Sequence, residues 1–115
     1  MEKLSKLETR VLNVILRTSV PAHAALLAQV PALAVARRQL TGAGVVTDFV
    51  LTDQGVPRAT PPSFHVAGVG GTHPESPSGI DFILFIRDGR IAWLESVSFD
   101  GVWPSDPDQI ELIPR

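Results

Sequence analysis

Glu95 and His65 are the residues of this chain whose types could do chemistry together. Glu95 follows Trp93 in a strongly apolar run, and a carboxyl group held among apolar side chains has a raised pKa that suits a general base. A histidine beside it would complete an acid–base pair, although the spacing identifies no third member of a catalytic triad. We therefore name Glu95 and His65 as catalytic candidates. The alternative is that Glu95 makes only a structural hydrogen bond or ion pair.

The histidines do not indicate a metal site. His23, His65 and His73 are not spaced like metal ligands, so a site would need the fold to bring Glu75 or Asp81 beside one of them. The chain has no cysteine, which excludes disulfides, thiolate ligands and cysteine nucleophiles. We expect no bound metal.

The glycine-rich stretch at residues 68–72 resembles a phosphate-binding loop only superficially. A dinucleotide-binding loop needs wider glycine spacing and a helix directly after it, and Pro74 and Pro77 prevent that helix. We interpret residues 70–79 as a loop and expect no bound cofactor.

The elements that must position these side chains centre on a hairpin over residues 80–99. Asp88-Gly89 is the strongest short signal for a two-residue turn between apolar strands. With this turn, Arg87 lies opposite Arg90 and Phe82 lies opposite Glu95. Both faces of the hairpin are then apolar, so we expect it to be central in its sheet and covered on both sides. The expected faces carry Ile80, Phe82, Leu84, Ile86, Ile91, Trp93, Glu95 and Val97 on one side and Ile83, Phe85, Ala92 and Leu94 on the other.

The same region supplies candidates for partner binding. If the second apolar face of the hairpin is bare, it marks a surface for another protein or a second copy of the chain. The two arginines at the tip repel each other unless an acid or a partner neutralises them, and a tryptophan after the last strand either covers the core or anchors an interface. The candidates are Ile83, Phe85, Arg87, Arg90, Leu94 and Trp103.

The N-terminal half predicts two helices and an edge hairpin. Residues 2–17 carry apolar side chains at helical spacing, and a second helix is expected to open near Ser19, with Pro21 in its first turn, and to end at Pro31. Residues 34–51 favour a hairpin turning at residues 41–44, and the pair Arg37-Arg38 places its first strand at a sheet edge.

Loops and one short strand account for the rest of the chain. Residues 52–63 are a proline-stiffened loop, residues 64–69 are a short strand, and the tail from residue 100 is expected to pack without long regular structure. The prediction is one α+β domain over residues 1–115, with two N-terminal helices packed on one face of an antiparallel sheet of about five strands.

Composition argues against nucleic-acid and membrane partners. The net charge is −2, and the six basic residues of the first 38 positions are accompanied by two acidic ones and no stacking aromatic. The N-terminus does not have the pattern of a signal peptide, and the uncharged stretch at residues 18–36 contains two prolines and is dominated by alanine. We expect a cytoplasmic protein.

Two segments resemble those of a loose group of small, uncharacterised bacterial proteins. Residues 39–49 (QLTGAGVVTDF) and 81–95 (DFILFIRDGRIAWLE) are similar to that group's TGxGxxTDF and LLFxRDGRxxxLE-like patterns. The resemblance rests on less than a quarter of the chain and implies an α+β fold but no assigned activity. Proteins of this size and style also resemble the immunity proteins of bacterial toxin systems.

These observations support two interpretations. The first is a non-catalytic cytoplasmic protein-interaction domain, homodimeric or immunity-like, that acts through the second face of the hairpin. The second is a small enzyme or ligand-binding protein with a pocket beside Glu95, His65 and Trp93. An enclosed cavity with converging polar groups near Glu95 would favour the second interpretation.

Overall fold

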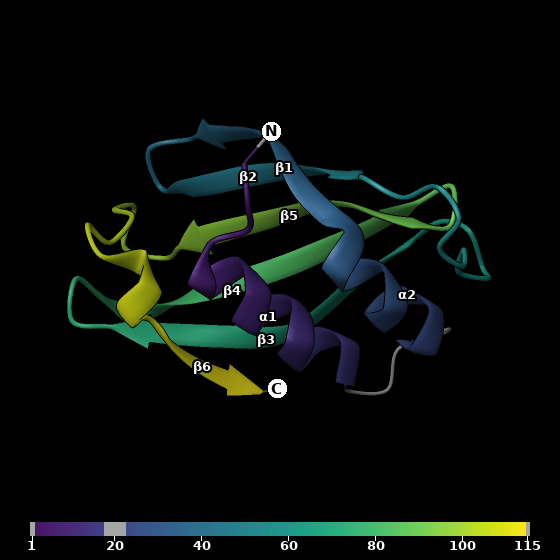
Figure 1. Cartoon of the computed structure of the whole chain (residues 1–115). Helices are drawn as coiled ribbons and strands as arrows, with labels where there is room; N and C mark the ends of the chain where they lie inside the picture. The colour runs from purple at the N-terminus through teal and green to yellow at the C-terminus, as the bar shows by residue number, and fades with distance from the viewer. Residues whose placement is uncertain (1, 18–22, 115) are drawn as a thin grey trace.

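The fold is α+β, with two N-terminal helices packed against a six-stranded antiparallel sheet (Figure 1). The computed structural model describes residues 2–17 and 23–114. Both helices lie on the same side of the sheet, as the sequence predicts (Figure 1). The elements are α1 (Lys6–Arg17), α2 (His23–Gln29), β1 (Leu33–Leu40), β2 (Gly44–Leu51), β3 (Phe64–His73), β4 (Ser76–Arg87), β5 (Arg90–Ser98) and β6 (Glu111–Pro114), with 3-10 turns η1 (Val30–Ala32) and η2 (Pro107–Gln109).

The strand order is β1-β2-β5-β4-β3-β6. The hairpin of β4 and β5 is central and β1 is an edge strand, and both positions agree with the sequence predictions. The predicted loop at residues 70–79 is wrong. Residues 70–73 continue β3, where they pair with β4 and β6, and residues 76–79 begin β4. The tail has no long regular element, as predicted, and adds the short strand β6 to the sheet of about five expected strands.

Helix α1 begins at a capping box. The Ser5 hydroxyl accepts a hydrogen bond from the Glu8 backbone N–H, and the Glu8 carboxylate accepts one from the Ser5 N–H. This reciprocal pair satisfies donors that the helix itself leaves free, so the helix starts at Lys6 and not at residue 2 as predicted. The expected start of α2 at Ser19 and Pro21 lies outside the described residues.

The hydrophobic core lies between α1, α2 and one face of the sheet. Helix α1 packs a continuous apolar stripe against β3 and β4, and alternate residues of the strands point toward it. The largest fully buried apolar side chains are Leu12, Ile15, Leu16, Leu26, Ile80, Phe82, Leu84, Ile86, Ile91, Leu94 and Ile110.

The β4–β5 hairpin turns at Asp88-Gly89 as predicted, but its register shifts by one residue beyond the turn. Asp88 and Gly89 both have positive φ, 54° and 74°, which is the geometry of a two-residue hairpin turn, and Arg87 pairs with Arg90. A β-bulge then leaves Ala92 without an opposite residue, so that Phe85 pairs with Trp93.

This bulge exchanges the two faces of β5. The predicted pairing of Phe82 with Glu95 is wrong, because Glu95 pairs with Ile83. Trp93, Glu95 and Val97 therefore point away from the helices, and Leu94 points into the core. The exchange keeps the Glu95 carboxylate out of the apolar core. Burial of a neutral polar group without a hydrogen bond costs on the order of 2–7 kcal/mol, and burial of an unpaired charge costs more.

Gln29, at the end of α2, stabilises the backbone where the bulge begins. Its side chain is fully buried; the amide oxygen accepts a hydrogen bond from the Ile91 N–H at 2.9 Å, and the amide nitrogen donates to the carbonyl oxygens of Gly89 and Pro57. One helix residue thus gives the Ile91 N–H its partner beside the turn, where the Gly89 carbonyl also accepts a bond from the Ala59 N–H.

Candidate functional site

The face of the sheet opposite the helices carries an ordered row of side chains. The register places His65 of β3, Phe85 of β4, Trp93 of β5, Asp48 of β2 and Arg37 of β1 opposite one another in sequence across five strands. The rings of Phe85 and Trp93 stack with centroids 4.6 Å apart, and the His65 ring lies 5.7 Å from that of Phe85. We call the surface formed by this row and its neighbours Ile83, Glu95, Val46 and Val97 the open face.

The two catalytic candidates both lie on the open face, but they are not brought together. Strand β4 lies between the strand of His65 and the strand of Glu95. The Glu95 carboxylate accepts a hydrogen bond from the indole N–H of Trp93 at 3.0 Å, while the exposed His65 ring rests against Phe85. This arrangement gives Glu95 the structural hydrogen bond that the sequence left as the alternative.

The partner-binding candidates divide between the two faces. Ile83 and Phe85 lie half-buried on the open face, where neither helix covers them. The expectation that the hairpin is covered on both sides is therefore wrong, because the helices occupy only one side. Leu94 does not share this face: the bulge at Ala92 turns it into the core, where it is 2% exposed.

The arginines at the hairpin tip lie opposite each other, as predicted. The Arg87 guanidinium lies 5.0 Å from the Trp93 ring centroid and 5.5 Å from that of Phe85, and it donates hydrogen bonds to the carbonyl oxygens of Ile86 and Phe64. Arg90 is half-buried. Arg87 is thus directed over the aromatic pair and makes a cation–π contact with it.

A cavity of about 360 Å³ lies on the other side of the sheet, near the start of α1. Trp103 forms part of its wall and packs half-buried against the core, so the structure shows the core-covering role that was one of its two predicted roles. Neither Glu95 nor His65 lines this cavity. Its lining residues are Ser5, Leu7, Glu8, Arg38, Leu40, Val45, Thr47, Leu94, Ser96, Trp103, Pro104, Ser105, Pro107 and Asp108.

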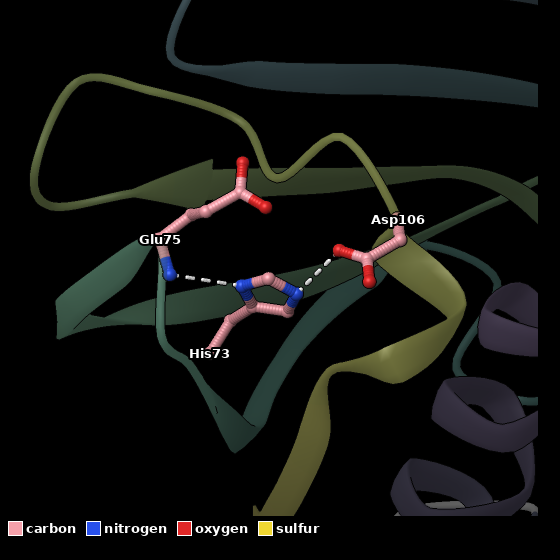
Figure 2. Close-up of side chains that lie close together, drawn as sticks. All are labelled: His73, Glu75 and Asp106. Carbon is pink, nitrogen blue, oxygen red and sulfur yellow. Dashed lines mark hydrogen bonds and ion pairs between the residues drawn. The ribbon is translucent and has the colours of Figure 1, made fainter.

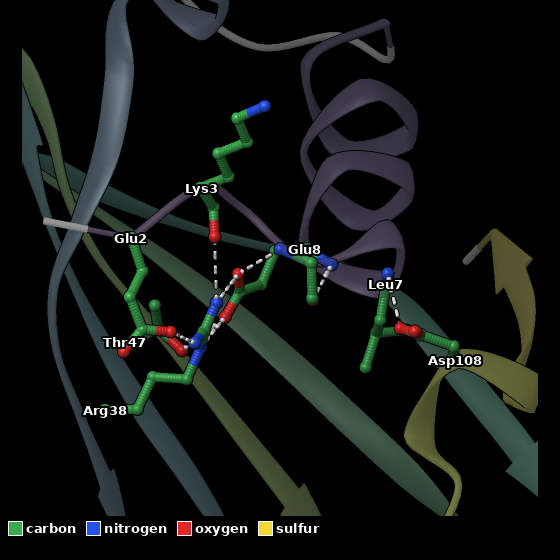
Figure 3. Close-up of polar contacts among 8 residues, drawn as sticks. Glu2, Lys3, Leu7, Glu8, Arg38, Thr47 and Asp108 are labelled. Atoms are coloured by element: carbon green, nitrogen blue, oxygen red, sulfur yellow. Dashed lines mark hydrogen bonds and ion pairs between the residues drawn. The ribbon is translucent and has the colours of Figure 1, made fainter.

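An ion pair between the buried Glu8 and the partly exposed Arg38 lies at the polar end of this cavity, and Figure 3 shows its contacts. A bulge at Ala36 in β1 turns Arg38 toward the helix side, while Arg37 points to the open face and pairs with Asp48. The Arg38 guanidinium donates two hydrogen bonds of 2.8 Å to the two Glu8 carboxylate oxygens. Its third charged contact is Glu2, also at 2.8 Å.

The Glu8 carboxylate has all of its acceptor positions filled. It accepts hydrogen bonds from Arg38, from the Ser5 N–H and from the Thr47 hydroxyl. Burial raises the pKa of Glu8, but the bonds from Arg38, Ser5 and Thr47 outweigh it and hold that pKa below its ordinary value. The same carboxylate raises the pKa of Arg38. Both groups are therefore charged, and their hydrogen-bonding positions are taken up by each other and by Ser5, Thr47 and Glu2.

His73, Glu75 and Asp106 form a cluster in which three ligand atoms come within 4.8 Å of one another (Figure 2). The His73 Nδ1 accepts a hydrogen bond from the Glu75 N–H, and Nε2 lies 2.6 Å from the Asp106 carboxylate. An acceptor role for Nδ1 leaves the ring proton on Nε2, so neither nitrogen offers a free lone pair to a cation. The Glu75 carboxylate in turn accepts bonds from Ser105. The cluster acts as a clamp that fixes residues 105–106 to the β3–β4 turn.

Sequence reasoning missed Glu8, Arg38 and Ser96 as lining residues of a cavity. One signal was present: Ser5-Lys-Leu-Glu8 has the spacing of a capping box, which places the Glu8 carboxylate back over the helix start. The inward turn of Arg38 depends on a bulge, and no residue pattern in β1 marks that bulge.

The fold and these sites define an α+β domain with a two-helix layer on one side of its sheet, an aromatic open face on the other, and a cavity at the start of α1. No protein-family model, curated protein or solved structure matches the chain. The resemblance to the bacterial group therefore stays a prediction. Within the described residues, no helix is both long enough and apolar enough to cross a membrane.

Proposed function

We propose that this protein is a non-catalytic interaction domain whose open face binds a second copy of the same chain. The observation that carries the proposal is the row of stacked aromatic and charged side chains across five strands, on a face to which neither helix contributes. Aromatic side chains, above all tryptophan, and arginine side chains contribute much of the binding energy at protein interfaces.

The area of the open face suits a dimer. With strands about 4.8 Å apart and about 3.3 Å of length per residue, a six-stranded face of this kind covers on the order of 700 Å². A standard protein interface covers about 800 Å² on each partner. Two such sheets stacked face to face would bury Ile83, Phe85 and Trp93 of both copies about 10 Å apart.

The charges on the open face favour a self-complementary contact. It carries both signs, with Arg37 and Arg87 on one hand and Asp48, Asp81 and Glu95 on the other. A two-fold axis places the same surface on both partners, so a face that pairs with itself needs both signs. A uniformly charged face would repel its copy.

The enzyme or ligand-binding interpretation near Glu95 and His65 receives less support. Its candidate residues lie on separate strands, and Glu95 already holds the Trp93 indole N–H. A general base must reach the proton that it removes, and a dyad needs its two members within hydrogen-bonding distance.

Sedimentation equilibrium tests the proposal. We expect the wild-type chain to dimerise with a dissociation constant on the order of 10 μM, and Ile83→Lys to weaken dimerisation at least tenfold because it buries a charge at the interface centre. The matched control is Leu40→Lys, since Leu40 is an exposed apolar residue of β1 that points to the helix side of the sheet. A wild-type chain that stays monomeric at millimolar concentration, or a dimer unaffected by Ile83→Lys, would overturn the proposal.

A further inference from the structure

We infer that the cavity at the start of α1 is a binding site for a small, neutral, mainly apolar molecule that carries one hydrogen-bonding group. The cavity is on the helix side of the sheet, so the inference is independent of the open face and of self-association. Its volume, about 360 Å³, falls in the range of small-molecule sites.

Apolar side chains make up most of the cavity wall. Leu7 comes from α1, Leu94 from the core face of β5, and Trp103 with Pro104 from the segment that follows β5. Leu40 lines the cavity and is 75% exposed, which extends this apolar surface to the solvent. Such a wall favours a ring or a branched aliphatic group, because transfer of apolar surface from water supplies the binding free energy.

The charged groups of the wall are already paired, which selects a neutral occupant. Glu8 and Arg38 bind each other through two hydrogen bonds, and Arg38 also binds Glu2 (Figure 3). The remaining lining charge, Asp108, is exposed and accepts a hydrogen bond from the Leu7 N–H at the helix start. An anionic ligand would meet two carboxylates, and a cationic ligand would compete with Arg38 for acceptors that are in use.

Ser96 supplies the polar contact. Its side chain lines the cavity, and its hydroxyl makes no hydrogen bond to another described residue. Because no buried side-chain oxygen or nitrogen of the described residues lacks a partner, this hydroxyl is open to the cavity. An accessible hydroxyl can donate to or accept from a polar group of a ligand. This serine faces the cavity because of the bulge at Ala92, which sets the side of the sheet to which residues 93–98 point.

The wall opposite the sheet is held in place by polar contacts and not by packing alone. Arg10 donates to the carbonyl oxygens of Asp108 and Ile110, and the His73–Asp106 and Glu75–Ser105 contacts anchor the same segment at its other side (Figure 2). A wall fixed on both sides keeps the cavity open without a ligand, so binding has little ordering cost.

Nuclear magnetic resonance with three matched probes tests the inference. Benzyl alcohol, benzoate and benzylammonium share a ring and differ in charge. We expect benzyl alcohol to shift the Trp103 indole N–H signal saturably, with a dissociation constant on the order of 1 mM, and the two ions to bind at least about fivefold more weakly. The chain has two tryptophans, so Trp93→Phe identifies the Trp103 signal.

Variants separate this site from other surfaces. Ser96→Ala is expected to weaken benzyl alcohol about threefold or more without lowering stability, because the hydroxyl has no protein partner to lose. Val45→Phe fills the cavity and should abolish the shift, whereas Val46→Phe, one residue along β2 on the open face, should leave it unchanged. Absence of a saturable shift, an equal response in Val45→Phe, or tighter binding of either ion would overturn the inference.

Discussion

At the scale of single residues, Gln29 stabilises the central hairpin beside its turn. Its amide group reaches from the end of α2 to the backbone of Gly89 and Ile91 and makes three hydrogen bonds, two of them fully buried. Buried backbone groups that lose their partners are costly, so this one side chain stabilises both the turn and the bulge next to it.

Replacement of Gln29 by alanine should destabilise the protein strongly. We expect Gln29→Ala to lower the free energy of unfolding by about 3 kcal/mol, because it leaves the buried Ile91 N–H unpaired and removes packed volume. Urea denaturation measures the change. Gln39→Ala, at an exposed position of β1, should cost less than about 0.5 kcal/mol. Equal effects of the two variants would contradict this role of Gln29.

Glu8 gives the stability of the fold a defined pH dependence. Because its pKa is lower in the folded chain than the ordinary value of 4.5, the folded state binds its proton less tightly than the unfolded state does. The stabilisation is therefore complete above about pH 4.5 and is lost as the pH falls through the lower, folded-state pKa.

Glu8→Gln should remove much of this dependence. We expect the variant to be less stable by about 2 kcal/mol near neutral pH and to show a smaller loss of stability below pH 4.5, measured by urea unfolding across an acid pH series. Asp100, whose pKa is lowered by hydrogen bonds from Ser78, adds a loss in the same direction, so some dependence should remain. Glu111→Gln, at an exposed position on β6, is the control. If Glu8→Gln keeps the full wild-type acid profile, the ion pair does not stabilise the fold as argued.

At the scale of elements, the contact of β2 with β5 requires a glycine. A Cβ atom added to Gly44 would lie 1.8 Å from the Ser96 carbonyl oxygen, so β2 could not keep its place beside β5. We expect Gly44→Ala to lower the free energy of unfolding by about 2–3 kcal/mol. Gly68→Ala on β3, where a Cβ meets nothing within 4 Å, should change it by less than about 0.5 kcal/mol. Thermal unfolding of the two variants compares them directly, and similar midpoints would contradict the close approach.

The sequence was sufficient for elements whose signals are local. Asp88-Gly89 predicted the hairpin turn, and Arg37-Arg38 predicted an edge strand. The face of each residue beyond Ala92 was not predictable, because the backbone beside the bulge is bound by Gln29, which lies about 60 residues away in the chain. The alternation rule fails by one residue there and reverses every later assignment.

The candidate sites depended on that same alignment. The prediction that Glu95 faces the core followed from an unbroken register, and the bulge instead places it beside Trp93 on the open face. The cavity could not be predicted from the sequence either, because its wall is formed where β1, β5, α1 and the segment after β5 come together. Ile83 and Phe85 belong to β4, which has no extra residue at the bulge, and they lie on the predicted face.

At the scale of the whole molecule, the sheet separates two surfaces of different character. The helix side contains the core and the cavity, and the open face carries the aromatic row and charges of both signs. A ligand in the cavity and a second copy on the open face would contact opposite sides of β2 and β5. Each can therefore be disrupted by substitutions that do not touch the other, as Val45 and Val46 illustrate.

The two margins of the sheet limit how large any assembly can become. Along β1, a bulge at Ala36 and the charges of Arg37 and Arg38 discourage another strand from adding, and β6 ends at Pro114, which has no N–H to offer. Growth strand by strand into fibrils is thereby obstructed at either flank. A dimer formed through the open face would cover the apolar surface of both copies, so association would stop at two copies. No apolar face would then remain exposed to cause aggregation at high protein concentration.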